Sequence, residues 1–251
     1  GQMLKVKATG DPANSDLDFQ TFSAPTQTAA GQGSYLATLT PEFDSPPNDP
    51  VHGVFAANDP DSINAFPVAF SGDPLPDRPE ASFRRFINLV TSSVSPFAFT
   101  CQISGPGIDR SNDTEIWWSG FGGISLLFQE GSAAPGVEGA KFREFLSLAM
   151  PENARPLLKA RVSRGGNRFG RGPARTADGL WYLDRGNAAR LYLLQGDPLP
   201  EANNRPVRKI HILENVPGSP TQTRSHNKQG QITFRADFND GSQAIIRASL
   251  P

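Results

Sequence analysis

The chain of 251 residues carries a net charge of −1, is 37% hydrophobic and 20% charged, and is rich in glycine (24) and proline (23). This balance gives no global attraction to nucleic acid or to an anionic membrane, and no run approaches the roughly 20 apolar residues of a membrane span. The single cysteine excludes an internal disulfide. Length and hydrophobic content suit one large all-β domain or two small ones.

The two halves of the chain carry opposite charge. Residues 1–130 hold 15 Asp/Glu and 6 Lys/Arg, a net of −9, and residues 131–251 hold 10 Asp/Glu and 18 Lys/Arg, a net of +8. Drift between repeats would explain this split. A dipolar molecule that orients on a partner, or self-associates with a second copy, would explain it as well.

A strand that runs into a Gly-Asp-Pro turn recurs along the chain. The turns start at Gly10, Gly72 and Gly196, and a degraded copy lies at Gly131, so the glycines are 62, 59 and 65 residues apart. A fixed period of this size marks a repeat architecture. Glycine reaches positive φ without penalty, aspartate can hydrogen-bond the backbone beyond it, and proline presets the next φ. Ser132 replaces Asp in the degraded copy, which indicates that the Asp serves the turn and is not an essential ligand.

Each period contains short strand-like runs with turn-rich borders, which predict strands and not helices. In chain order the predicted strands are 18–22, 34–39, 52–56 and 66–70; then 83–88, 97–103, 115–119 and 124–129; then 142–148, 156–162, 180–184 and 190–195; and finally 209–213, 231–238 and 243–248. The repeats run over about 11–72, 73–131, 132–196, and 197–251 together with 1–10.

Equivalent strands of the repeats share side-chain signatures. The first strands carry an F-x-x-F pattern, at Phe19/Phe22, Phe83/Phe86, Phe142/Phe145 and, as an aliphatic copy, Val207/Ile210. The second strands place a small residue between two larger ones on one face, at Tyr35-Ala37-Leu39, Phe99-Cys101-Ile103, Leu158-Ala160-Val162 and Phe234-Ala236-Phe238. The third strands are aromatic in the inner copies, at Phe55, Trp117-Trp118 and Trp181-Tyr182. These aromatics could face a sugar, but we expect core packing for at least one of each pair.

The last repeat supplies three strands, and the missing fourth is found at the other end of the chain, over residues 3–8. Repeats that close by pairing an N-terminal strand with the last unit are typical of a β-propeller, which removes its open edges by radial closure. We therefore predict one all-β domain over 1–251, a β-propeller of four blades with four antiparallel strands each. An open array, or half of an eight-bladed ring completed by a second chain, are the alternatives.

The same motifs resemble those of a known group of repeat proteins. The G-D-P-x-P turns at 72–76 and 196–200, the F-x-x-F strands, and the G-Q-x-x-F-x-A strand at 230–236 resemble the propeller-like repeats of uncharacterised bacterial exported and surface proteins. The resemblance covers essentially the whole chain. It implies an architecture but no established activity and no catalytic residues.

Motifs for catalysis and metal binding are missing from the sequence. No nucleophile elbow, dinucleotide fingerprint or phosphate-binding loop occurs. His52, His211 and His226 are far apart, and the single cysteine supplies no ligand pair for zinc. Cys101 occupies the position of an alanine in the other repeats, so we expect a small core residue. Segment 11–18 has oxygen ligands at alternating spacing, which suits calcium, although solvated turn polarity explains it equally well. We expect no cofactor, with calcium as the alternative.

The loops between second and third strands should gather with the Gly-Asp-Pro turns on one side of the scaffold. They span 40–51, 104–114 and 163–177, while the fourth, 239–241, is short. Loops on a rigid scaffold are where binding concentrates. The third loop and its flank hold Arg161 and the candidate ligand-binding residues Arg164, Arg168, Phe169, Arg171 and Arg175. Such arginines suit planar anions, and a flexible solvated loop is the alternative.

These patterns predict a non-enzymatic binding or interaction module of an exported bacterial protein. Because residues 1–2 look like a trimmed start, we expect an extracellular, cell-surface or periplasmic location after loss of a signal peptide. The ligand would be a glycan or a protein, and not nucleic acid. Two alternatives stay open. One is a carbohydrate-active hydrolase or lyase, which would need two carboxylates or a His–Arg–Tyr cluster in one cleft. The other is a structural, self-assembling module.

Overall fold

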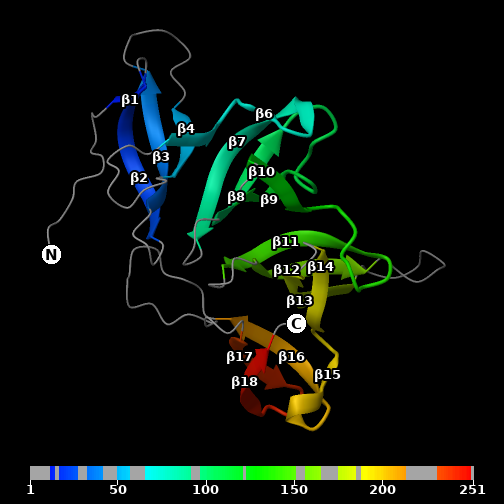
Figure 1. The fold of residues 1–251 in the computed structure, drawn as a ribbon. Coiled ribbons are helices and arrows are strands. Elements are labelled where there is room, and N and C mark those ends of the chain that lie inside the picture. Colours follow the sequence, from blue (N-terminus) through cyan, green and yellow to red (C-terminus); the bar gives the residue numbers. More distant parts are fainter. Residues whose placement is uncertain are drawn as a thin grey trace, which may run out of the picture. The chain divides into compact units, whose positions relative to one another are not determined.

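The structure is a computed structural model that describes residues 12–14, 17–27, 33–41, 50–56, 66–91, 97–120, 123–150, 156–164, 175–184, 188–212 and 231–249. These residues form antiparallel β-sheets (Figure 1). The described part of the chain contains no α-helix, and its single helical turn is a 3-10 turn, η1, at Pro200–Ala202. It therefore holds no helix long and apolar enough to cross a membrane.

Four sheets follow one another along the chain, and in each of them the strands pair in sequence order. The first sheet contains β1 (Pro12–Asn14), β2 (Leu17–Gln27), β3 (Gly33–Pro41), β4 (Val51–Ala56) and β5 (Phe66–Phe70). The second contains β6 (Pro74–Leu75), β7 (Arg78–Thr91), β8 (Phe97–Ser104), β9 (Thr114–Gly120) and β10 (Gly123–Gln129). The third contains β11 (Ala140–Ala149), β12 (Leu157–Arg164), β13 (Arg175–Leu183) and β14 (Ala189–Leu194). The fourth contains β15 (Pro198–Leu199), β16 (Arg205–Ile212), β17 (Gln231–Phe238) and β18 (Gln243–Ser249).

The predicted all-β repeat architecture is confirmed at the level of strands and sheets. Each strand predicted within the described residues overlaps a strand of the structure, with ends that differ by a few residues. The strand predicted over residues 3–8 lies outside the described residues. The sequence analysis missed the short strands β1, β6 and β15, in which the chain pairs with the next long strand just after a turn. A two- or three-residue strand leaves too little alternation to be recognised in a sequence.

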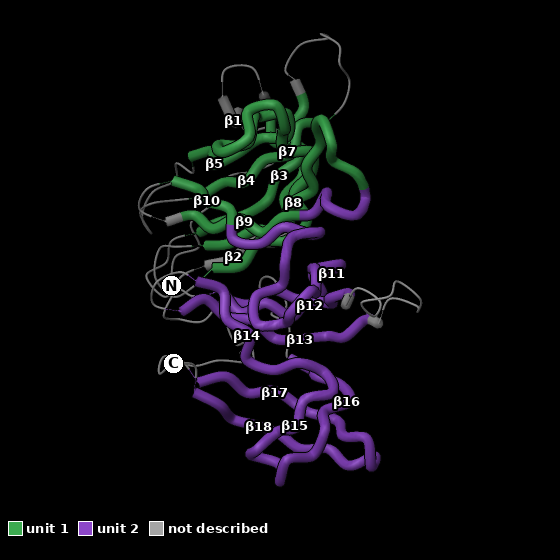
Figure 2. Tube along the Cα trace, turned by 90° about the vertical axis from the view of Figure 1, so that its right-hand side faces the viewer, with its two compact units in different colours: residues 1–109, 115–126, 217–219 green, residues 110–114, 127–216, 220–251 purple. Residues whose placement is uncertain are grey.

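The chain divides into two compact units, which are described separately (Figure 2). In the first unit, Leu36 and Val54 of the first sheet share a core with Phe83 and Phe99 of the second sheet. In the second unit, Leu157 and Leu180 of the third sheet share a core with Phe234 of the fourth sheet, among others. Each unit therefore buries one face of a sheet against its successor in the chain.

A β-bulge explains why the F-x-x-F pattern has a spacing of three in a strand. In the second sheet, Phe83 pairs with Ile103 and Phe86 pairs with Cys101. The two phenylalanines are three positions apart on β7, whereas their partners are only two positions apart on β8. The register shift leaves one extra residue, Arg84, which is exposed. An extra residue returns both aromatics to the same face of the sheet.

The bulge recurs at the equivalent place in every sheet. The register shifts fall between Phe19 and Thr21, Phe83 and Arg85, Phe142 and Glu144, and Val207 and Lys209. The extra residues are Gln20, Arg84, Arg143 and Arg208, and all of them are exposed. The opposing small-residue triads of the second strands are buried, as predicted.

The inter-sheet turn has the positive φ that its glycine predicts. Gly72, Gly131 and Gly196 have φ of 93°, 78° and 96°, a region that glycine enters without steric cost. Each glycine N–H donates to the carbonyl of the first F-x-x-F residue, at distances of 2.7 to 2.8 Å. The turn therefore anchors the start of the next sheet.

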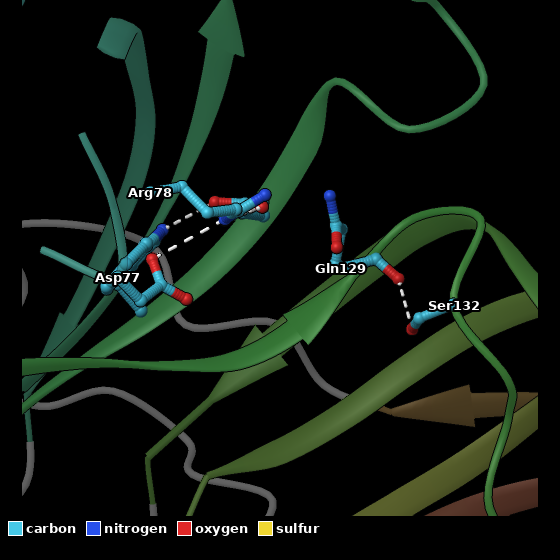
Figure 3. A network of polar contacts seen from close by, with 6 residues as sticks. Asp77, Arg78, Gln129 and Ser132 are labelled. Carbon is cyan, nitrogen blue, oxygen red and sulfur yellow. Dashed lines mark hydrogen bonds and ion pairs between the residues drawn. The ribbon is translucent and has the colours of Figure 1, made fainter. Parts of the chain in front are cut away.

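The role predicted for the turn aspartate is wrong in direction. The Asp73 carboxylate accepts a hydrogen bond from the Phe70 N–H at 2.7 Å, so it bonds the backbone before it and not beyond it. In the degraded copy, the Ser132 hydroxyl donates to the Gln129 carbonyl at 2.6 Å (Figure 3). Both side chains close the same three-residue span, which supports a turn role and not a ligand role.

Candidate functional site

The arginine-rich candidate site lies at the end of the hairpin formed by β12 and β13. These strands pair without a register shift from Leu157–Tyr182 to Arg164–Arg175. Arg164 and Arg175 are therefore opposite each other, and residues 165–174 connect the two strands in sequence. Arg168, Phe169 and Arg171 lie outside the described residues, as do the side chains of Arg164 and Arg175.

Arg161, on the flank of this hairpin, is held by carboxylates of its own sheet. Its Nη1 lies 2.7 Å from Glu144 Oε2 and its Nε lies 2.9 Å from Asp178 Oδ1. The side chain crosses from β12 to both neighbouring strands. Because its charge is compensated there, Arg161 is a cross-strand ion pair and not one of the available anion ligands of the loop.

The inter-sheet turns lie beside the connections between second and third strands, as expected. In the third sheet, Gln195 N–H donates to the Asp178 carbonyl at 2.8 Å, and Gln195 Oε1 accepts from the Asp178 N–H at 3.1 Å. In the second sheet, Glu130 N–H donates to the Thr114 carbonyl at 3.0 Å. Within each of these sheets the loops and the turn therefore share one end.

Glu130, at such a turn, is a buried carboxyl with an unusual protonation behaviour. Burial raises its pKa to about 7, while a hydrogen bond from Thr114 lowers the pKa and the nearby charges of Asp113 and Glu144 raise it further. The Glu130 residue is only 7% exposed. It can therefore hold a proton near neutral pH, but it faces the protein interior and not a substrate.

A second buried carboxylate, Glu115, lies at the start of β9 in the second sheet. Its Oε1 accepts from Arg78 Nη2 at 2.6 Å, and its Oε2 accepts from Trp117 Nε1 at 2.9 Å. Arg78 also approaches Asp77, at 3.5 Å (Figure 3). Burial raises the pKa of Glu115, and the bonds from Arg78 and Trp117 oppose this shift. The arrangement ties the turn after β6 to the third strand of the sheet.

A polar cluster lies on one face of the fourth sheet. His211 Nε2 lies 2.9 Å from Asp237 Oδ2 and 3.0 Å from Arg235 Nη2. Arg235 Nε is 3.2 Å from Asp237 Oδ1, close enough for an ion pair, but the two atoms are not aligned for a hydrogen bond. The hydrogen bond with His211 is the main cause that lowers the pKa of Asp237. The carboxylate is therefore ionised at neutral pH.

The aromatic third strands pack in the interior. Trp117 is 1% exposed and Trp181 is 0% exposed. Trp181 Nε1 donates to the Pro135 carbonyl at 2.9 Å, and its ring lies 5.1 Å from that of Phe142. Core packing is confirmed for one member of each pair. Cys101 is buried as predicted, and burial raises the pKa of its thiol well above the usual value.

The metal expectations are tested only over the described residues. In this part of the chain no three His, Cys, Asp or Glu side chains are placed to hold a metal ion. His52 and His211 belong to different compact units, and His226 lies outside the described residues. In segment 11–18, considered above as an alternative calcium site, Asp11, Ser15, Asp16 and the side chain of Asn14 also lie outside them.

Sequence reasoning missed Glu115, Glu130 and the cluster around Asp237. The sequence did hold a signal for Glu115. The other three repeats have a small residue at the equivalent position of the third strand, namely Gly53, Gly179 and Ala244, so a glutamate there is an exception. The cluster around Asp237 depends on pairing His211 with Arg235 across 24 residues, which no local motif marks.

The fold and these sites define an all-β repeat protein, built from four meander sheets with the same turn and the same bulge. A model for a family of unknown function, DUF7453, matches residues 1–250, so the chain belongs to this family. No curated protein matches the chain.

Two of the solved structures that match the chain show only weak similarity to it. One is a Trypanosoma rangeli sialidase, with 12% identity and a TM-score of 0.37 over 92% of this chain and 37% of that chain. The other is a hypothetical protein from Leishmania major, with 8% identity and a TM-score of 0.21 over 94% of this chain and 87% of that one. This chain therefore spans well under half of the sialidase chain.

Proposed function

We propose that the chain is a non-enzymatic binding module of an exported bacterial protein, and that it binds an acidic glycan. The binding site is the tip of the β12–β13 hairpin. One observation supports the proposal: the uninterrupted register pairs Arg164 with Arg175, and the segment that connects these two paired positions holds Arg168, Phe169 and Arg171. Guanidinium groups bind carboxylate and sulfate in a planar, two-pronged geometry.

The base of this hairpin favours binding at its tip. Arg161 is paired with Glu144 and Asp178 on the two neighbouring strands, so it belongs to the support of the hairpin and is not a ligand at its tip. Leu158, Ala160 and Val162 on β12 are all fully buried. The hairpin is therefore a firm support, as binding loops require.

Binding of acidic polysaccharides to the full chain tests the proposal. Polygalacturonate and heparin are suitable probes, and neutral dextran is the matched uncharged control, each measured with and without calcium. We expect Arg164→Ala/Arg168→Ala/Arg171→Ala to weaken binding at least about tenfold, since charge-assisted pairs contribute about 1.5–3 kcal/mol each. Unchanged binding by this variant, at an unchanged melting temperature, would refute the hairpin site. Binding only with calcium would favour the alternative that segment 11–18 holds a calcium ion.

We also propose that residues 3–8 form the outer strand of the fourth sheet. The first three sheets each end in a fourth long strand, β5, β10 or β14, whereas β18 has no such partner among the described residues. The alternation of Leu4, Val6 and Ala8 suits the side of β18 on which Ile246 and Ala248 are buried. An added strand would cover the open edge of this sheet.

A further inference from the structure

The fourth sheet differs from the first and the third on one of its faces. In the first sheet, Val54 lies opposite Leu36, and both are buried against the second sheet. At the same register in the fourth sheet, Ile245 lies opposite Arg235. Ile245 is 71% exposed, and Val54 is 0% exposed. The face that serves for packing in the first unit is therefore open to solvent in the fourth sheet.

This face is rich in cations. Arg208 and Lys209 lie at the bulge opposite Asp237, His211 pairs with Arg235, and Arg247 pairs with Thr233. Arg208, Lys209 and Arg247 are exposed. The equivalents of Arg247 are Ala56 in the first sheet and Tyr182 in the third, and both are buried. Four arginine and lysine charges against one carboxylate leave the surface strongly positive.

Asp237 organises the centre of this surface without neutralising it. The His211 nitrogen that donates a hydrogen bond to Asp237 cannot accept one from Arg235 at the same time. Arg235 Nε is a buried nitrogen without a hydrogen-bond partner, although Asp237 lies near it. The guanidinium is thus held in one orientation by a carboxylate while its side chain stays 41% exposed. The guanidinium of Arg235 therefore keeps N–H donors that an oxyanion of a ligand can reach.

We propose that this surface, made of Arg208, Lys209, His211, Arg235 and Arg247 around Asp237 and called the basic face below, binds a linear polysaccharide that carries carboxylate or sulfate groups. Its cations come from three adjacent strands, which lie roughly 4.8 Å apart. A row of this kind matches an extended polymer that bears one acidic group after another better than it matches a single small anion. The basic face shares its ligand class with the hairpin site but none of its residues, and it lies on the fourth sheet and not at the hairpin tip.

The test compares two sets of variants of the full chain. Arg235→Ala/Arg247→Ala removes two cations of the basic face, and Arg190→Ala is the control, because Arg190 is exposed and paired with Asp184 on the third sheet. Binding to heparin and to polygalacturonate is measured between about 50 and 300 mM salt. We expect the double variant to lose about tenfold or more in affinity, and its log–log salt slope to fall by about two. The control should bind like the native chain.

The hairpin variant separates the two sites. Loss of binding only in Arg164→Ala/Arg168→Ala/Arg171→Ala would overturn the basic face and uphold the hairpin site. Loss of binding only in Arg235→Ala/Arg247→Ala would uphold the basic face and overturn the hairpin site. Arg247→Glu, at an exposed position, guards against misfolding and should weaken binding more than Arg247→Ala does. Salt-sensitive self-association without polysaccharide, abolished by the double variant, would assign the basic face to a second copy of the chain and overturn the proposal.

Discussion

Single residues show where one sheet departs from the common plan. Gly53 and Gly179 have the ring of Phe55 or Trp181 so close that an added Cβ would lie 2.7 or 2.5 Å from it. Glu115 takes this place in the second sheet and holds Trp117 by a hydrogen bond in place of ring stacking over a glycine. A buried carboxylate needs a partner charge, and Arg78 supplies it. Where the first and third sheets pack an aromatic ring against a glycine, the second sheet therefore has an ion pair, and this ion pair fixes the turn before β7.

Glu130 should make stability depend on pH near neutrality. Its folded-state pKa of about 7 lies above the ordinary value of 4.5, so the folded chain binds the proton more tightly than the unfolded chain does. Its contribution is fully present below pH 4.5 and is lost as the pH rises through 7. We expect Glu130→Gln to remove about 3 kcal/mol of this decline in unfolding free energy between about pH 4.5 and 8.

Urea unfolding of the native chain and of Glu130→Gln at several pH values measures this effect. Glu138→Gln, an exposed position in the same turn region, is the matched control and should leave the pH profile as it is. Parallel pH profiles for the native chain and Glu130→Gln would contradict a raised pKa.

At the scale of elements, the bulge is the feature that the sequence shows and that strand periodicity alone cannot explain. The F-x-x-F spacing fits neither strict alternation nor a helix, and pairing of Phe86 with Cys101 resolves it. The small-residue triads and the glycine turns could be predicted because alternation and positive φ are local properties. Salt bridges such as Arg161–Glu144 depend on register across 17 residues. Register is set by tertiary packing, so these pairs could not be predicted.

Removal of the bulge should be far more harmful than removal of its side chain. Deleting Arg84 would turn Phe86, which is 7% exposed, to the other face of β7, at a cost of about 3–5 kcal/mol. Arg84→Ala keeps the extra residue and should change stability by about 0.5 kcal/mol or less. Chemical denaturation of both variants tests this expectation. Equal stability of the two would mean that the register of β7 does not need the extra residue.

At the scale of the whole molecule, the sequence predicted four sheets of antiparallel strands but not the polarity of each face. The triad Phe234-Ala236-Phe238 follows the large–small–large pattern of the other second strands, so the sequence alone does not distinguish the fourth repeat from the others. The opposite face, with Arg235 and Arg247, carries charge where the first sheet carries apolar side chains. The excess of positive charge in the second half of the chain is concentrated in part on this face.

Closure by the N-terminal strand predicts a global effect of a small truncation. Without residues 1–9, the fourth sheet would lose its outer strand, and the melting temperature of the whole chain should fall by several degrees, about 2–4 °C for each kcal/mol lost. Differential scanning calorimetry measures the change. Lys5→Glu/Lys7→Glu keeps the length of the segment and serves as the control. An unchanged melting temperature in the truncated chain would refute closure by this strand.

The sequence-ordered pairing within each sheet also bears on how the chain comes to be folded. Every long strand bonds to the one just before or just after it, so most pairings can form once a stretch of a few tens of residues is available. Low sequence separation speeds folding and limits the time during which apolar strands stay exposed. Within each unit, the sheets can therefore assemble one after the other as the chain is synthesised, with the second sheet covering a face of the first and the fourth covering a face of the third.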